Sequence, residues 1–527
     1  MKKRIVACPA CAAPVEFQLS TALVTVCEFC RSIVARGDKK VEDHGKVADI
    51  VETNSPIHRG QSGKYQKKRF EVVGRVQYQH PAGGVWNEWY LRFPGDRVGW
   101  LAEAQGKFYL MFEKQFADAA ELPSFESLTV GHRFEIPGGG GFSVAEKGVA
   151  SARSADGDIP WAFRQNADHR FADLHGDNDQ FATLEFDEAR PRGFFGREVP
   201  LAELNLEGDG WSMSAPPVAG SGALQLNCPN CAGPLTLHVP DQSQRVTCPS
   251  CKGLLDCEQG KLKYLQTLKL PVAKPVIPLG SVGKLFDTEY TVIGFMERFA
   301  VWEGKKFPWT EYLLYDPTKG FRWLVRNQGH WSFVEAVSLA KVTRGGDRDD
   351  VGFDGQEFKL YDRGSAQVQF VVGEFYWRVT TEEKVFTQDY IAPPLMLSFE
   401  TTRSDKGSEE NVSLGRYITV DEIEVAFNLK DLPRPFGVGT IQPLPKRADV
   451  WAMWVCFASL LAVLDFVFVS GAVKKPVDQF HFFTAQMFVF AFPMLMWFGR
   501  RSFEVNRWSN SDYSPYATSE SESEGEE

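Results

Sequence analysis

Residues 8–17 read CPACAAPVEF, and residues 228–237 read CPNCAGPLTL. Each phrase opens a set of four cysteines made of two Cys-x2-Cys pairs. Fifteen residues separate the pairs in the first set and sixteen in the second. This spacing is typical of a four-cysteine zinc site. The two sets are Cys8, Cys11, Cys27, Cys30 and Cys228, Cys231, Cys248, Cys251.

Zinc geometry explains why the cysteines occur in pairs of pairs. Each Cys-x2-Cys turn directs two thiolates toward one point, and a hairpin between the pairs lets four sulfurs form a tetrahedron. Residues 14–26 and 234–247 support that hairpin, because apolar residues alternate on both sides of a polar turn. Disulfides and a redox Cys-x2-Cys site are the alternatives, and the missing export signal and the matched double pairs disfavour them. We therefore predict two structural zinc ions.

The similarity between the two halves extends far beyond the cysteines. VWNEWYLRF at 85–93 matches PWTEYLLYD at 308–316, and the stretch from Trp100 matches the one from Trp323. Gly60, Gly63 and Gly74 match Gly280, Gly283 and Gly294 in the same way. Weaker matches follow: FSVAEKG from Phe142 with FKLYDRG from Phe358, LEF at 184–186 with LSF at 397–399, and Gly196 with Gly415. This collinearity indicates a tandem duplication of one module, composed of a zinc ribbon and a β-rich domain.

The fold class follows from the composition and the local periodicity. Residues 85–93 alternate with the period of a strand, and similar short runs recur between Gly-containing turns. The whole chain contains 46 Gly and 30 Pro, which also favours antiparallel strands joined by turns. We expect a mainly β chain with two zinc ribbons and two antiparallel β barrel or sandwich-like domains in tandem, followed by a two-helix transmembrane hairpin. The expected boundaries are zinc ribbon 1 at 1–36, β domain 1 at 55–210, zinc ribbon 2 at 223–256, β domain 2 at 275–430, the hairpin at 449–499 and a disordered acidic tail at 500–527.

Two glutamates at matching positions, Glu88 and Glu311, are the weak candidates for catalysis. Each lies between aromatic residues, where a raised pKa would suit a general acid or base. The alternative is a strand glutamate paired with a neighbouring cation. In the sequence alignment of the two copies, no second carboxylate, histidine or nucleophile recurs beside them. On this basis an enzyme is the less favoured class.

The C-terminal region changes abruptly in composition. Residues 451–470 carry one charge, Asp465, and residues 480–498 contain no Asp, Glu, Lys or Arg. Each stretch approaches the ~20 residues that span a bilayer core. We predict two transmembrane helices in an antiparallel hairpin, and a buried helical hairpin in a soluble domain is the alternative. The zinc-type cysteines and the missing export signal place the ribbons, β domains and tail in the cytosol.

Net charge disfavours one class of partner. The chain carries a formal charge of -10, and few Lys or Arg lie between the cysteine pairs, so no basic field attracts nucleic acid. A nucleic-acid-binding zinc ribbon remains an alternative on the cysteine spacing alone.

The chain as a whole resembles a bacterial family known as domain of unknown function 4178. The resemblance rests on the CPACAAPVEF-type ribbon, the Gly60-x2-Gly63 stretch, and the strand Trp86-x-Glu88-Trp89 with its counterpart Trp309-x-Glu311-Tyr312. It implies no activity or binding residue, but it implies a bacterial inner-membrane setting and an envelope-stress or polyamine-linked system. Together with the features above, it leads us to expect a membrane-anchored cytosolic scaffold or adaptor, which binds a protein partner and contacts the bilayer through 451–470 and 480–498.

Overall fold

The fold is seen in a computed structural model. It describes the following residues: 4–36, 41–50, 55–81, 85–104, 107–116, 122–187, 190–207, 224–239, 243–258, 261–268, 274–344, 350–381, 383–443, 447–472, 479–509, 511 and 513. Most of the predicted acidic tail, 514–527, lies outside these residues. The start of that tail was predicted too early, because the last helix continues through Arg507.

Each half of the chain begins with a small ribbon of short antiparallel strands. In the first, β1 (Arg4–Ala7) pairs with β2 (Pro14–Phe17), and β3 (Val24–Val26) pairs with β4 (Ser32–Arg36), which pairs with β5 (Val41–Lys46). The second repeats this order with β16 (Leu224–Asn227), β17 (Pro234–Leu237), β18 (Arg245–Thr247), β19 (Gly253–Glu258) and β20 (Lys261–Thr267). We call these ribbon 1 and ribbon 2.

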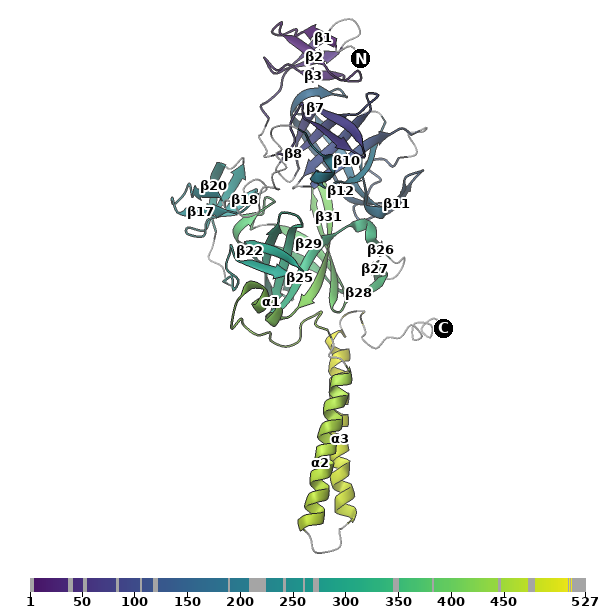
Figure 1. Ribbon diagram of the computed structural model, residues 1–527, viewed down its shortest axis with the longest axis vertical. Coiled ribbons are helices and arrows are strands. Elements are labelled where there is room, and N and C mark those ends of the chain that lie inside the picture. Colours follow the sequence, from purple (N-terminus) through teal and green to yellow (C-terminus); the bar gives the residue numbers. More distant parts are fainter. Residues whose placement is uncertain are drawn as a thin grey trace.

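Ribbon 1 leads into a closed antiparallel barrel, which we call barrel 1 (Figure 1). Two meanders of four strands are joined along both edges, so the ring has no free edge. Around the ring the strands are β7 (Lys68–Gln79), β8 (Val85–Arg92), β9 (Val98–Ala104), β10 (Lys107–Lys114), β15 (Arg192–Glu198), β14 (Gln180–Glu185), β13 (Asp168–Gly176) and β12 (Gly140–Ile159), which returns to β7.

Barrel 2 has the same strand order. Its ring is β22 (Thr288–Trp302), β23 (Lys305–Asp316), β24 (Gly320–Asn327), β25 (His330–Val337), β31 (Gly407–Ile418), β30 (Leu395–Ser404), β29 (Lys384–Ala392) and β28 (Gln356–Phe375), which returns to β22. The mainly β prediction and the tandem duplication are confirmed, and of the two predicted architectures the chain adopts the barrel.

Smaller elements surround the two rings. They are β6 (Ser62–Tyr65), β11 (Arg133–Ile136), the 3-10 turns η2 (Asp177–Asp179) and η3 (Leu201–Leu204), β21 (Val282–Leu285), η4 (Leu339–Lys341), β26 (Val342–Arg344), β27 (Asp350–Phe353) and helix α1 (Val420–Phe427). Thr419 and Glu422 form a capping box that defines the start of α1, and this short helix packs beside β21.

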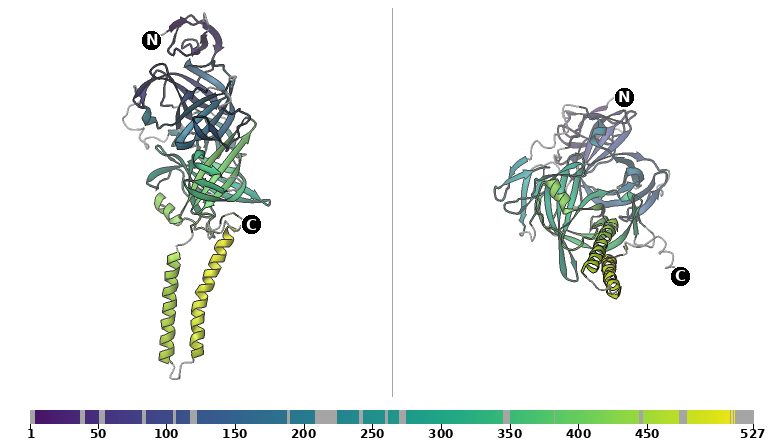
Figure 2. Two further views of the ribbon diagram at one scale, coloured as in Figure 1. Left: turned by 90° about the vertical axis from the view of Figure 1, so that its right-hand side faces the viewer. Right: turned by 60° about the horizontal axis from the view of Figure 1, so that its bottom comes forward.

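The two barrels are joined by strand pairing. In β12 and β31, Glu146, Lys147 and Gly148 lie opposite Glu409, Ser408 and Gly407. A side chain at Gly407 would lie 2.9 Å from the carbonyl oxygen of Lys147, so the close approach of the strands requires glycine there. The modules therefore lie side by side (Figure 2).

Two kinds of contact attach each ribbon to its own barrel, and they are the same in both modules. β3 extends the sheet beside β12, and β18 does so beside β28. A buried carboxylate then accepts two ribbon backbone N–H groups. Asp158 Oδ2 lies 2.5 Å from Gln18 N and 2.7 Å from Leu19 N. Glu374 Oε1 and Oε2 lie 2.7 and 2.9 Å from the backbone nitrogens of residues 238 and 239.

The chain ends in a hairpin of two long helices, α2 (Arg447–Ala472) and α3 (Gln479–Arg507), which projects from barrel 2 (Figures 1 and 2). The helices predicted around 451–470 and 480–498 are therefore present. Arg507 anchors the base of α3, because its Nη2 donates to the backbone oxygens of Gly439, Thr440 and Gln442. Across the described residues, no helix is both long enough and apolar enough to cross a membrane.

Candidate metal centres and a buried ionisable cluster

The eight predicted metal ligands form two compact clusters. In each set of four cysteines, all sulfur atoms lie within 4.8 Å of one another. The Sγ atoms of Cys8 and Cys30 are 3.7 Å apart, and those of Cys231 and Cys248 are 3.8 Å apart. The structure thus brings together all eight residues that the spacing selects.

The sulfur separations fit a tetrahedral metal site. A tetrahedron with metal–sulfur bonds of ~2.3 Å has sulfur–sulfur edges of about 3.8 Å, whereas a disulfide bond measures about 2.05 Å. The measured separations of 3.7 and 3.8 Å match the tetrahedral edge. Four thiolates also fill the coordination shell, which is the arrangement of a structural site.

Four repeated turns produce this geometry. In each one the first cysteine N–H donates to the carbonyl five residues later, and the fourth residue after the cysteine donates back to it, as for Cys8 with Ala13 and Ala12. That fourth residue is left-handed in every turn: Ala12, Arg31, Ala232 and Lys252 have φ of 61°, 63°, 57° and 60°. The two other cysteines do not belong to the clusters: Cys257 is buried in the core of ribbon 2, on β19, and Cys456 is exposed on α2.

The catalytic candidates Glu88 and Glu311 occupy equivalent places inside the two barrels. Glu88 on β8 lies opposite Val76, and Glu311 on β23 lies opposite Met296. The indole N–H of Trp86 donates to Glu88 Oε1 at 3.1 Å, and that of Trp309 donates to Glu311 Oε1 at 2.6 Å. Both carboxylates are buried. Their sequence equivalence is therefore a structural equivalence.

Two further carboxylates recur with them, which corrects the expectation that none does. Asp173 and Asp389 lie opposite Thr183 and Ser398 in the two barrels. Two residue pairs further along, Glu185 and Glu400 lie opposite Phe171 and Thr387. Matching LEF at 184–186 with LSF at 397–399 is therefore wrong by two residues. A shift of two keeps every side chain on the same face of a strand, so the pattern alone could not reveal it.

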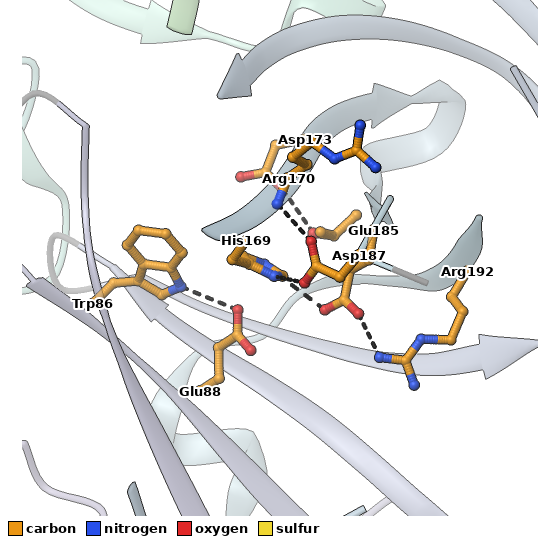
Figure 3. A network of polar contacts seen from close by, with 9 residues as sticks. Trp86, Glu88, His169, Arg170, Asp173, Glu185, Asp187 and Arg192 are labelled. Carbon is orange, nitrogen blue, oxygen red and sulfur yellow. Dashed lines mark hydrogen bonds and ion pairs between the residues drawn. The ribbon is translucent and has the colours of Figure 1, made fainter. Parts of the chain in front are cut away.

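In barrel 1 a histidine and an arginine pair with Glu185, and the histidine also pairs with Asp187 (Figure 3). His169 Nδ1 lies 2.5 Å from Asp187 Oδ2, and its Nε2 lies 3.9 Å from Glu185 Oε1. Arg192 Nη2 lies 2.7 Å from Glu185 Oε2. Strand β8 is not a neighbour of β13 or β14, so Glu88 approaches this cluster from across the barrel interior. Sequence reasoning missed all four partners, because only the closure of the ring brings these strands together.

Burial controls the protonation of the barrel 1 cluster. It raises the pKa of Glu88 to about 8, with the charge of Glu185 adding to the effect. Burial alone would lower the pKa of His169, but the hydrogen bond to Asp187 and the charge of Glu185 raise it to about 9. At neutral pH, therefore, Glu88 is mostly protonated and His169 is mostly charged. Glu88 Oε2 is buried and has no hydrogen-bond partner among the described residues.

In barrel 2 one arginine takes the place of both cations. Arg298 Nη1 lies 3.3 Å from Glu311 Oε1 and 2.7 Å from Glu400 Oε1. Burial raises the pKa of Glu311, and the charge of Arg298 opposes that effect. The alternative interpretation of Glu311 as a strand glutamate paired with a cation is thus the one that the contacts match.

Comparison with known proteins identifies the family of the chain but gives no information about its activity. Two segments, residues 58–201 and 278–420, match the family described as a domain of unknown function (DUF4178). Each matched segment covers most of one barrel, and together they span more than half of the chain. Neither a curated protein nor a solved structure is significantly similar to the chain.

Proposed function

We propose that this chain, which belongs to the DUF4178 family, is a membrane-anchored scaffold whose paired modules bind a protein partner. The anchor would be the α2–α3 hairpin, and the ribbons and barrels would form the binding part. The observation that supports the proposal most is the apolar surface of that hairpin.

Large apolar side chains are exposed along both helices. Phe457, Leu460 and Leu464 on α2 are 51%, 56% and 54% exposed, and Phe488 and Leu495 on α3 are 74% and 68% exposed. Soluble monomers rarely expose contiguous apolar patches of more than a few hundred Å². With 26 and 29 residues, the helices extend about 40 Å at 1.5 Å per residue. That length is comparable with the ~30 Å thickness of a bilayer core.

The charge distribution at the base of the hairpin supports a lipid bilayer as the surroundings of its apolar side chains. Arg500 and Arg501 lie on α3 near its base, between the apolar stretch and the barrels. Basic residues beside an apolar segment favour the cytosolic leaflet, where anionic headgroups are found. This arrangement would hold the ribbons and barrels in the cytosol.

We assign zinc to the two four-cysteine clusters on the chemistry of the donor set. Four thiolates at tetrahedral spacing suit zinc, and each site would hold its ribbon together, since a ribbon of this size has too small a core to fold alone. The bound metal would supply structural stability. Docking of each ribbon on its barrel would then give every module one rigid surface for a partner.

Liposome flotation of the full-length protein tests the anchor. We expect the chain to float with vesicles of mixed zwitterionic and anionic phospholipids. Leu464→Glu with Leu495→Glu should reduce flotation at least tenfold, because a charge at membrane depth costs about 2.5–3.5 kcal/mol. The matched control is Val301→Glu with Trp302→Glu, which alters apolar residues of barrel 2 that are 56% and 61% exposed.

A different occupant of the hairpin would give a different result. If a second copy of the chain covers these side chains, the protein stays with the lipid-free fraction and elutes as a dimer, which the same hairpin variants dissociate. That outcome would contradict the membrane anchor.

A second candidate function is acid–base catalysis in barrel 1. The observation in its favour is Glu88, a buried carboxyl with a pKa of about 8 beside His169. Such a group holds a proton at neutral pH and could donate it. Glu88→Gln keeps the shape and the hydrogen bond from Trp86 but cannot titrate. An unchanged cellular phenotype in a folded Glu88→Gln, Glu311→Gln variant would remove this candidate.

A further inference from the structure

A pocket of about 480 Å³ opens on the outer face of barrel 2. Its floor is a row of three side chains from neighbouring strands: Glu297 on β22, Thr310 on β23 and Arg326 on β24. These residues alternate with Arg298 and Glu311, which point into the barrel, so the row faces outward. The volume lies within the ~300–1,000 Å³ range of small-molecule sites.

The outer wall of the pocket is the segment that follows α1. Arg434 and Phe436 line the opening, and the Phe436 N–H donates to the Gln328 carbonyl oxygen at 3.0 Å. Pro435 packs against Gly329, where an added Cβ would lie 2.7 Å from the Pro435 Cα. The wall is therefore fixed to the barrel by a hydrogen bond and a close contact.

Arg326 has hydrogen-bond donors with no acceptor. Within the described residues its guanidinium forms no ion pair, and its Nε is buried without a hydrogen-bond partner. Trp331 lies opposite it on β25, and the Arg326 guanidinium lies 5.7 Å from that ring centroid. The indole N–H of Trp331 is also buried without an acceptor in the described chain. Buried donors of this kind are costly unless something accepts from them.

Barrel 1 shows how the same row is completed internally. Glu103 lies opposite Asn87 there, at the position that Arg326 occupies opposite Thr310. Its Oε2 accepts from Asn87 Nδ2 at 3.2 Å and from the Trp89 indole N–H at 2.8 Å. The first module thus supplies its own carboxylate to the indole donor. The second module has an arginine in place of that carboxylate and Tyr312 in place of Trp89. Its Trp331 lies at the position of Phe108, so barrel 1 has no donor there.

We propose that the barrel 2 pocket binds a small organic carboxylate. The carboxylate would accept from the Arg326 guanidinium, which lines the pocket and can hold it in a bidentate pair. The apolar body of the ligand would lie against Pro308 and Phe436. This inference is independent of the membrane anchor, because it rests on contacts of barrel 2 alone.

The charges around the pocket favour a singly charged ligand. Arg434 is paired with Asp421 and Glu424, so Arg326 is the cation available at the floor. Glu297 contributes a negative charge two strands away. A phosphate monoester carries nearly two charges at neutral pH and would be repelled by Glu297 more than a carboxylate is.

Titration calorimetry on the full-length protein in mild detergent tests the site with four probes: phenylacetate, hexanoate, phenylacetamide and phenyl phosphate. We expect phenylacetate and hexanoate to bind. Phenylacetamide, which has the same shape without the charge, should bind at least tenfold more weakly, and phenyl phosphate should bind more weakly than phenylacetate. Tighter binding of the phosphate would overturn the assignment to a carboxylate.

Variants locate the binding. Arg326→Gln should weaken phenylacetate binding at least tenfold, whereas Arg403→Gln, at an exposed arginine on β30, should leave it unchanged. Arg326→Glu introduces the acid that barrel 1 carries at this position and should abolish binding, because it replaces the cation at the floor with a negative charge. Unchanged binding in a folded Arg326→Gln variant, or no binding of either carboxylate at millimolar concentration, would overturn the proposal.

Discussion

The two barrels place carboxylates at the same three strand positions but pair them with different cations. In barrel 1 the cations are His169 and Arg192. In barrel 2 the single cation Arg298 comes from β22 and reaches two of the acids. Both solutions satisfy the rule that buried charges need partners. The duplication therefore preserved the acids, and the cation was replaced from a different strand.

The two ribbons, in contrast to the barrels, have almost the same geometry. Each has the same turns, the same left-handed residues and nearly equal sulfur separations. A tetrahedral metal site permits little variation in the position of its four ligands, whereas a buried charge can be compensated from any side. The predictions below test where the modules behave alike and where they differ.

Loss of a metal ligand should have the largest effect on stability, and the effect should be equal in the two modules. Cys27→Ser and Cys248→Ser remove buried ligands at equivalent positions. Structural zinc in such small domains supplies about 10–16 kcal/mol of apparent binding free energy, so the affected ribbon should unfold. We expect elemental analysis to fall from two zinc ions per chain to one in either variant. Limited proteolysis should cut the altered ribbon only.

The exposed cysteine on α2 provides the control for that experiment. Cys456→Ser lies outside both clusters and should leave two zinc ions per chain. Fewer than two zinc ions in the reduced wild-type protein would contradict the metal assignment for both ribbons.

Removal of the barrel 2 cation should cause the next largest loss of stability. The loss should be larger than that caused by removing a cation from barrel 1. Arg298→Met leaves Glu311 and Glu400 without their shared partner, and an uncompensated buried charge costs about 3–5 kcal/mol. His169→Gln should cost less, because Arg192 still pairs with Glu185. Urea unfolding at pH 7 measures both, with the exposed Arg403→Met as control. A larger loss for His169→Gln would reverse the comparison.

The contacts that attach each ribbon to its barrel should also differ in strength between the two modules, by a smaller amount. Glu374 accepts from two backbone N–H groups and also from Ser243 Oγ at 3.0 Å, whereas Asp158 lies in the equivalent place with a shorter side chain. Hydrogen bonds to a charged acceptor contribute about 1.5–3 kcal/mol each. We expect Glu374→Gln to cost about 3 kcal/mol and Asp158→Asn somewhat less. Hydrogen exchange at residues 18, 19, 238 and 239 should accelerate in the matching variant alone.

How far the sequence predicts this molecule depends on whether the signal is local. The cysteine turns and the paired helices could be predicted because their spacing along the chain defines them. The barrels could be predicted as β because alternation is also a local property. Such local patterns do not contain the contacts between strands that are far apart in sequence.

The buried cluster illustrates that limit. Glu88 was identified because its aromatic neighbours recur beside Glu311. Glu185 and Glu400 were missed because a two-residue shift of one strand preserves its inward and outward faces, and the sequence alignment settled on the wrong register. His169 has no counterpart in the second copy that could have drawn attention to it. Only closure of the ring places it near Glu88.

Titration of the inner glutamates should give the smallest effect and the clearest pH signature. Glu88 has an ordinary pKa of 4.5 and a pKa of about 8 in the folded protein. Between these values the folded state keeps a proton that the unfolded state has released, so this group destabilises the fold progressively as pH rises from 4.5 to 8. Glu88→Gln removes the effect. We expect the variant to gain about 2 kcal/mol over wild type between pH 6 and pH 8, at about 1.4 kcal/mol per pH unit.

The same substitution in barrel 2 completes the comparison. Burial raises the pKa of Glu311 too, but Arg298 favours its charged form, so the gain of Glu311→Gln with pH should have the same sign and a smaller size. The exposed Glu135→Gln on β11 should show no such gain. Urea unfolding at intervals from pH 5 to pH 9 measures all three variants. If Glu311→Gln gains as much as Glu88→Gln, a fixed cation and a titratable one are equivalent partners for a buried acid. The contrast between the barrels would then be one of sequence alone.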